Sequence, residues 1–233
     1  MKIDRRKHYI LVFDTETANT HKEGNSLDAS SGLVYDFGYM VTDTKGNIYK
    51  EGSFICRDIF FDMQEIMKSA YYADKIPAYI EDISAGKREV KTFYEIRKEI
   101  LDTIKEYNIK EVSAHNAAFD IKVLNATQRY LTKSKYRFFF PYGIEIWDSM
   151  KMANSVIAKM PTYKKFCENH NYMTKHKTPR PRVTAEILYR FIDKNNDFVE
   201  SHTGLEDVKI EYQIIMYCYK QKKKMQKKLY ERA

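Results

Sequence analysis

Residues 9–17 read Tyr9-Ile10-Leu11-Val12-Phe13-Asp14-Thr15-Glu16-Thr17, five apolar residues that run into two acids and two hydroxyls. An unbroken apolar run that ends at polar residues is typical of a strand buried on both faces. In a strand, Asp14 and Glu16 point to the same face, about 7 Å apart along the chain. Carboxylates at this spacing suit Mg²⁺ or Mn²⁺. On these residues alone, a strand that ends in a polar turn with solvated acids explains the pattern equally well.

Composition sets the protein class. The 233 residues suffice for one large domain or two small ones, and 43% hydrophobic and 31% charged residues are typical of a soluble globular protein. The net charge of +8 favours a polyanionic partner such as nucleic acid. Cys56, Cys167 and Cys218 show no metal-ligand spacing, so we interpret them as reduced residues of a cytoplasmic protein. The apolar run at residues 9–13 is too short for a signal peptide or a membrane span, and neither is expected.

The segments that follow the first strand predict an antiparallel hairpin beside it. Residues 33–42 and 48–56 are rich in β-forming residues, and the turn at 43–47 has hairpin length. The polar stretch at 18–31 predicts a loop next to the two acids. Residues 57–91 are less regular, with apolar spacing that is only roughly helical.

The second half of the chain alternates helices and strands. Residues 92–107 predict an amphipathic helix, and Thr92 with Glu95 forms a capping box. Three strands followed by alternating helices and strands argue for an α/β structure with a mixed sheet flanked by helices. The remaining expected elements are strands at 111–116 and about 143–147, helices at 117–131, 148–157, 162–172 and 183–193, and a final helix from about Gly204 into the lysine-rich end.

Two more acids stand at predicted helix starts. Asp120 lies in the first turn of the helix at 117–131, where the helix dipole favours an anion. Asp207 lies at the start of the last helix, and His202 precedes it by five residues. Taken singly, each of these residues has a structural explanation.

Three segments taken together resemble the DEDDh branch of the DnaQ-like 3′–5′ exonucleases. That family includes the epsilon subunit of bacterial DNA polymerase III, RNase T and oligoribonuclease. The order, the spacing and the secondary-structure context of the segments all agree with the family. The segments are Val12-Phe13-Asp14-Thr15-Glu16-Thr17, His115-Asn116-Ala117-Ala118-Phe119-Asp120 and His202-Thr203-Gly204-Leu205-Glu206-Asp207.

The resemblance covers about residues 8–215 and implies one exonuclease domain over 1–233, with a basic C-terminal helix extension at 216–233. The implied fold is RNase H-like, with a mixed five-stranded sheet. The chain also departs from the family pattern. Ala18 and Asn19 stand where a glycine is usual, Gly204 stands where alanine is common, and the insert around 172–200 is long.

By resemblance, the four acids Asp14, Glu16, Asp120 and Asp207 hold two divalent ions, Mg²⁺ or Mn²⁺. His202 acts as the general base, because a histidine titrates near neutral pH. The product is a nucleoside 5′-monophosphate released from a 3′ end. The substrate contacts expected nearby are the backbones of Thr15 and Thr17 and the ring of Phe119, which core packing explains as well.

The expected partner is a single-stranded nucleic acid 3′ end, with DNA favoured over RNA and no membrane. A 3′–5′ exoribonuclease is the alternative, and a non-catalytic nucleic-acid-binding or polymerase-accessory module is a third. A DNA polymerase or another replication protein is an expected partner. The composition suggests a bacterial or phage source and a cytoplasmic location. The basic loop at 175–182 and the lysine run at 220–228 either contact phosphates or are solvated surface.

Overall fold

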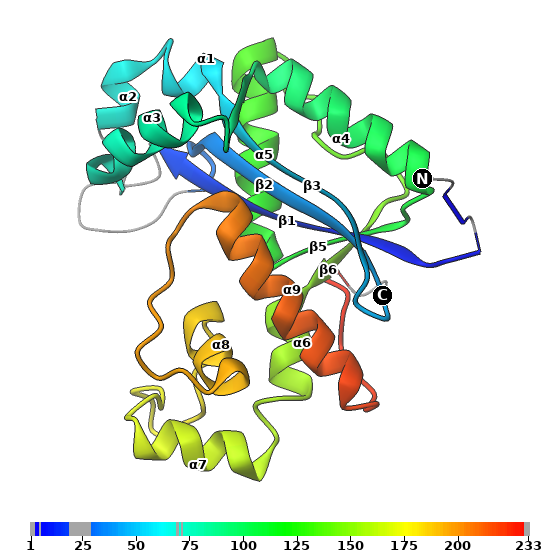
Figure 1. The fold of residues 1–233 in the computed structure, drawn as a ribbon, viewed down its shortest axis with the longest axis vertical. Coiled ribbons are helices and arrows are strands. Elements are labelled where there is room, and N and C mark those ends of the chain that lie inside the picture. The colour runs from blue at the N-terminus through cyan, green and yellow to red at the C-terminus, as the bar shows by residue number, and fades with distance from the viewer. Residues whose placement is uncertain (1–2, 5, 19–28, 69, 71, 231–233) are drawn as a thin grey trace.

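The computed structural model describes residues 3–4, 6–18, 29–68, 70 and 72–230. Most of the loop predicted at residues 18–31, including Asn19, lies outside the described residues. The strands are β1 (Tyr9–Ala18), β2 (Leu33–Asp43), β3 (Ile48–Cys56), β4 (Glu89–Lys91), β5 (Glu111–Ala114) and β6 (Glu145–Asp148). They form one sheet in the order β4-β3-β2-β1-β5-β6 (Figure 1).

The first strand lies inside the sheet, as the sequence predicts. β1 pairs antiparallel with β2 and parallel with β5, and its residues 10–13 are fully buried. The hairpin of β2 and β3 is confirmed as well. Its turn is closed by Asp43, whose Oδ1 accepts the backbone N–H groups of Lys45 at 2.9 Å and Asn47 at 3.0 Å, and Gly46 takes a positive φ of 88°.

The mixed α/β sheet is confirmed, but it has six strands where the sequence predicted five. The unpredicted strand is β4, a three-residue edge strand that pairs parallel with β3. Glu89 and Val90 are exposed and Lys91 is half-buried, so the segment lacks the apolar alternation by which a strand is recognised.

Helices cover both faces of the sheet. The predicted capping box starts α4, with Thr92 Oγ1 accepting the Glu95 N–H at 3.2 Å and Glu95 Oε2 accepting the Thr92 N–H at 2.8 Å. The helices are α1 (Arg57–Phe60), α2 (Gln64–Lys68), the 3₁₀ turn η1 (Ala73–Lys75), α3 (Ile76–Ser84), α4 (Phe93–Tyr107), α5 (Ala117–Thr132), α6 (Ser149–Ser155), α7 (Pro161–Asn169), α8 (Ala185–Asp193) and α9 (Gly204–Lys220).

Alternation along β1 divides the core into two layers. Leu11 and Phe13 pack with residues of α4 and α5 on one face, whereas Ile10 and Val12 pack with residues of α6, α8 and α9 on the other (Figure 1). Because strand residues alternate between faces, Asp14 and Glu16 continue the even-numbered series. The two acids therefore belong to the face that α9 covers.

The chain leaves the helix earlier than the sequence predicted. α9 ends at Lys220, and Lys222 takes a positive φ of 52°, so the expected helix over 216–233 is wrong for residues 221–230. Like charges one turn apart destabilise a helix, and this run is rich in lysine. The segment instead returns to β6, where the Leu229 N–H donates to the Ile146 carbonyl at 2.8 Å. Residues 231–233 lie outside the described residues. No helix among the described residues is long and apolar enough to cross a membrane.

Candidate active site

The three acidic segments converge where β1 ends and where α5 and α9 begin. Asp14 and Glu16 are half-buried on β1, Asp120 is 3% exposed in the first turn of α5, and Asp207 is 5% exposed in the first turn of α9. The pairing of β1 with β2 shifts register between Glu16 and Thr17. The fold thus brings together four carboxylates that are far apart in the sequence.

Asp120 is held by a residue of β1. The Thr15 hydroxyl donates to Asp120 Oδ1 at 2.7 Å, and both residues are buried. Asn116, with a positive φ of 64°, turns the chain from β5 into α5 and so places Asp120 in the first turn. Because the Thr15 hydroxyl is bonded to Asp120, the expected substrate contact of Thr15 rests on its backbone. The contacts expected of Thr17 and Phe119 also stay predictions; Phe119 packs partly buried against the core.

Glu16, His202 and Asp207 form a group whose side chains could together hold a metal ion. Each offers one ligand atom, and these three atoms lie within 4.8 Å of one another. The Asp207 N–H donates to the Thr203 carbonyl at 3.0 Å, which closes the first turn of α9. Carboxylate oxygens and an imidazole nitrogen suit a divalent ion such as Mn²⁺.

The acids lie in an environment that disfavours their charged forms. Burial is the largest cause in each case, and it raises the pKa of Asp120 to about 7 and that of Asp207 to about 8. Burial also raises the pKa values of Asp14 and Glu16 well above their ordinary range, and repulsion from the neighbouring carboxylates adds to both shifts. A divalent cation would replace the protons that this cluster otherwise holds. The donor set therefore fits divalent metal ions.

His202 lies in the loop before α9, at the edge of the cluster. Its side chain is 35% exposed and stacks on Tyr72, with ring centroids 4.6 Å apart and planes at 15°. Partial burial lowers the pKa of His202 below its ordinary value, and the charge of Lys75 lowers it further. A neutral imidazole at neutral pH can accept a proton. The role of His202 as the general base stays a prediction.

A network beneath the site joins α9 to the sheet. Asp36 of β2 is fully buried, and its Oδ2 accepts the Gly204 N–H at 2.9 Å, the Tyr79 hydroxyl at 2.8 Å and Arg88 Nη1 at 3.1 Å. Arg88 is also buried and donates through Nη2 to Glu206 at 3.0 Å. Arg88 thus pairs with Asp36 on β2 and with Glu206 on α9. The two ion pairs hold the start of α9, and thereby Asp207, against β2.

One buried acid of the site escaped the sequence analysis. Glu211 lies on α9, four residues after Asp207, and is 2% exposed. Its Oε1 accepts the backbone N–H of His115 at 2.8 Å. The available signal was a glutamate four residues after Asp207, and therefore on the same helix face, in the mostly apolar segment 208–218.

The histidine of the second segment has a structural role. The ring nitrogens of His115 lie 2.8 Å from Ser149 Oγ and 2.8 Å from the Val183 carbonyl oxygen. Burial lowers the pKa of His115, so the ring is held neutral. These contacts join the end of β5 to α6 and to the segment before α8.

A pocket of about 530 Å³ opens beside the acids. Asp14 and Glu211 line it, and so do Arg180 and Arg182 from the basic loop predicted at 175–182. The loop is closed at its base, where the Thr174 N–H donates to the Arg180 carbonyl at 2.8 Å. Two cations of this loop thus share a pocket with Asp14, one of the four predicted metal ligands.

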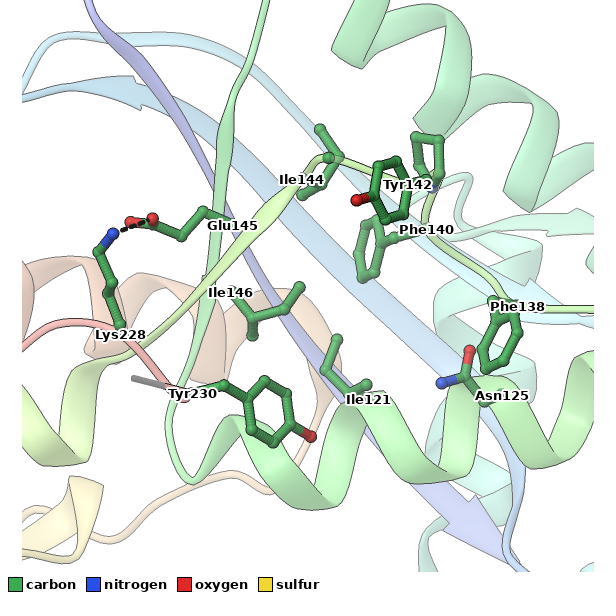
Figure 2. A pocket seen from close by; sticks show the side chains of 12 residues that line it. Ile121, Asn125, Phe138, Phe140, Tyr142, Ile144, Glu145, Ile146, Lys228 and Tyr230 are labelled. Atoms are coloured by element: carbon green, nitrogen blue, oxygen red, sulfur yellow. Dashed lines mark ion pairs between the residues drawn. The ribbon is translucent and has the colours of Figure 1, made fainter. Parts of the chain in front are cut away.

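A second groove, of about 610 Å³, contains none of the candidate catalytic residues. Figure 2 shows its aromatic lining from the segment before β6 and from Tyr230, with Glu145 and Lys228 paired at one end. Glu145 begins β6, which runs parallel to β5, whereas the acids lie beyond the opposite ends of these strands. Of these two pockets, the one of about 530 Å³ is lined by a candidate catalytic residue, Asp14. The aromatic residues that line the groove are Phe138, Phe140, Tyr142 and Tyr230.

Comparison with known proteins was made by sequence and by structure. No protein-family model matches the chain, and no curated protein matches it by sequence. Similar solved structures exist. A 3′-exonuclease described by its 3′-end-specific recognition of the histone mRNA stem-loop is 16% identical, with a TM-score of 0.57, and the match covers 94% of this chain and 84% of that one.

Two further structures agree with this match. The nuclease domain of 3′hExo, described as a DEDDh family member bound to rAMP, is 16% identical with a TM-score of 0.56, over 97% of this chain and all of that one. Escherichia coli Exonuclease I in complex with a dT13 oligonucleotide is 15% identical with a TM-score of 0.54, over 91% of this chain and 41% of that one. At these identities the likeness concerns the fold, and the chain has the RNase H-like α/β fold of these 3′-exonuclease structures.

Proposed function

We propose that this protein is a divalent-metal-dependent 3′–5′ exonuclease of the DEDDh type. Its substrate is the 3′ end of DNA, preferably single-stranded, and its products are nucleoside 5′-monophosphates. The observation that carries the proposal is the convergence of Asp14, Glu16, Asp120 and Asp207 on one buried site with His202 at its edge. The fold shared with 3′-exonucleases supports it.

The position of each residue indicates its role in the proposed reaction. Glu16 and Asp207 lie beside His202, so with Asp14 they would hold an ion on the side of the attacking water. Asp14 and Asp120 would hold a second ion near the leaving 3′ oxygen. Bound ions at such a site supply charge stabilisation for the attacking and the leaving oxygen of an in-line displacement.

Proton transfer falls to His202. The neutral imidazole takes a proton from the water as its oxygen attacks the terminal phosphorus. The bond between that phosphorus and the 3′ oxygen of the preceding nucleotide breaks. That oxygen takes a proton from solvent water and becomes the new 3′ hydroxyl, and the released nucleotide keeps its 5′-phosphate. The stacking contact with Tyr72 holds the ring of His202 at the edge of the site.

A second candidate function differs from the proposal in the sugar of the substrate. A 3′–5′ exoribonuclease would use the same residues, and the matched structures include one described with an RNA stem-loop, one with rAMP and one with dT13. We extend the DNA proposal to proofreading or end trimming in the cytoplasm, beside a polymerase or another replication protein.

Product analysis tests direction and sugar together. DNA and RNA oligonucleotides of matched sequence carry either a 3′-terminal label or an internal label, and the products are identified by chromatography. The proposal expects early release of the 3′-terminal nucleotide from DNA as a 5′-monophosphate. Release from RNA alone would select the exoribonuclease, and early release of internal nucleotides would exclude an exonuclease that starts from the 3′ end.

A further inference from the structure

α9 carries an acid that the three sequence segments do not include. Glu211 is 2% exposed, and Oε1 is satisfied by the His115 N–H. Oε2 is buried and has no hydrogen-bond partner among the described residues. Burying a charged oxygen without a partner is costly, so this arrangement needs an explanation.

The location of Glu211 points toward the acids. Residues four apart on a helix share a face, so Glu211 lies on the same face of α9 as Asp207. Glu211 and Asp14 line the same pocket. Burial raises the pKa of Glu211 well above its ordinary value, and repulsion from Asp120 and Asp207 raises it further. The side chain therefore faces the carboxylates that are proposed to bind metal.

A purely structural role explains Glu211 poorly. The accepted hydrogen bond from His115 needs one neutral oxygen, which a glutamine amide supplies without a charge. A buried carboxylate among other carboxylates lowers the stability of the protein unless a cation compensates it. The second oxygen of Glu211 has the chemistry of a hard ligand for Mg²⁺ or Mn²⁺.

Building on the exonuclease function proposed above, we propose that Glu211 is a fifth carboxylate ligand of the divalent-ion centre, on the side of Asp14 and Asp120. The predicted ligand set gives the ion on that side only those two residues. A third carboxylate there gives the ion one more anionic oxygen and holds it before substrate arrives.

Binding of Mn²⁺ to the whole protein tests the proposal without reference to activity. Glu211→Gln keeps the size of the side chain and its acceptor for His115, and Glu145→Gln removes a carboxylate at the far end of the sheet as the matched control. Loss even of a residue that only supports a metal ligand weakens metal affinity about 10–100-fold. Calorimetric titration should therefore show at least about tenfold weaker Mn²⁺ binding for Glu211→Gln, and wild-type affinity for Glu145→Gln.

Thermal unfolding gives a second readout. In EDTA near neutral pH, Glu211→Gln should melt at a higher temperature than the wild type, because the variant no longer buries a carboxyl group that must either take up a proton or carry a repelled charge on folding. Saturating Mn²⁺ should raise the melting temperature of the wild type by more than that of the variant. Should Glu211→Gln fail to fold, Glu211→Asp takes its place in the titration. That change withdraws the ligand by one carbon, so weaker Mn²⁺ binding supports the proposal and unchanged binding overturns it.

The outcomes separate this proposal from the function on which it builds. Equal Mn²⁺ affinity and equal Mn²⁺-induced melting shifts for the wild type and Glu211→Gln would overturn the fifth ligand alone, provided that the wild type binds Mn²⁺ and shortens DNA. A wild type that binds no Mn²⁺ would overturn both.

Discussion

The backbones of Gly38 on β2 and Gly204 at the start of α9 lie in direct contact. A Cβ on Gly204 would lie 2.6 Å from the Gly38 nitrogen, and a Cβ on Gly38 would lie 2.2 Å from the Gly204 carbonyl carbon. At the same place the Gly204 N–H donates to Asp36 Oδ2 at 2.9 Å. The close approach of the two backbones explains why glycine stands at 204, where the family resemblance leads one to expect alanine.

Gly204→Ala should displace the start of α9, and with it Asp207. Overpacking of this kind costs about 1–3 kcal/mol, and the free energy of unfolding should fall by that amount in urea titration. Exonuclease activity should fall as well, because Asp207 lies three residues further on. A variant with wild-type stability and activity would show that the contact at Gly204 relaxes freely.

Arg88→Met should destabilise the protein by about 3–5 kcal/mol, because it leaves the buried carboxylate of Asp36 without its ion-pair partner. The double variant Arg88→Met with Asp36→Asn should recover part of this loss, since position 36 then no longer carries a fully buried unpaired charge. Urea denaturation of the wild type, the two single variants and the double variant measures the interaction free energy between Arg88 and Asp36. A double variant whose loss equals the sum of the single losses would contradict the importance of the pair.

Sequence patterns predicted the parts of the fold that local residues determine. The apolar run of β1, the hairpin turn at Asp43 and the capping box at Thr92 are local signals, and each is confirmed. β4 was not predicted, because its three residues do not alternate between buried and exposed positions. The end of α9 escaped because residues 221–230 are held by contacts with β6, far away in the sequence.

The same distinction applies to the candidate site. The acids and His202 were predicted because three spaced segments resemble a known family, and the structure brings them together. Glu211 lies outside those segments, in a run that otherwise predicts a plain buried helix. The bond from Thr15 to Asp120 depends on how β1 packs against α5, which no local pattern reveals.

His202→Ala should lower turnover by about 10²–10⁴-fold, the usual loss for a general base. The ligand atoms of His202, Glu16 and Asp207 lie within 4.8 Å of one another, so His202 has the position of a metal ligand as well as that of a base. Mn²⁺ titration of the same variant distinguishes these two roles. Loss of a residue that acts only as a base leaves the Mn²⁺ affinity nearly unchanged, whereas loss of a metal ligand weakens it. His8→Ala, an exposed histidine paired with Glu111, serves as the control. Near-wild-type turnover of His202→Ala would remove this residue from the mechanism.

The metal-free protein should lose stability as the pH rises from about 4 to about 8. The folded pKa values of Asp120, about 7, and Asp207, about 8, exceed the unfolded value of about 3.9. The stabilisation from these protonated groups is full below the unfolded pKa and is lost as the pH rises through the folded pKa. Melting temperatures in EDTA measure the decline, and Mn²⁺ should reduce it by replacing the protons. A flat profile in EDTA would show that these groups do not hold protons when buried.

Replacing Arg180 and Arg182 by alanine should weaken binding of single-stranded DNA and reduce its salt dependence, by about 0.7 in the logarithmic slope for each phosphate that the protein no longer neutralises. The measurement uses the Asp14→Ala background, so that the strand is not cut. Lys223→Ala with Lys224→Ala removes two exposed charges from the C-terminal segment and is the matched control. Equal losses of affinity from both pairs would mean that general charge, and not the pocket, governs binding.

The most direct test of metal-dependent exonuclease activity is digestion of 5′-labelled single-stranded DNA in Mn²⁺ by wild-type protein and by Asp14→Ala, purified in parallel. We expect a ladder that shortens from the 3′ end with the wild type, no ladder with Asp14→Ala and none in EDTA. DNA that stays at full length with a folded, Mn²⁺-loaded wild type, or an equal ladder with Asp14→Ala, would contradict the proposed function.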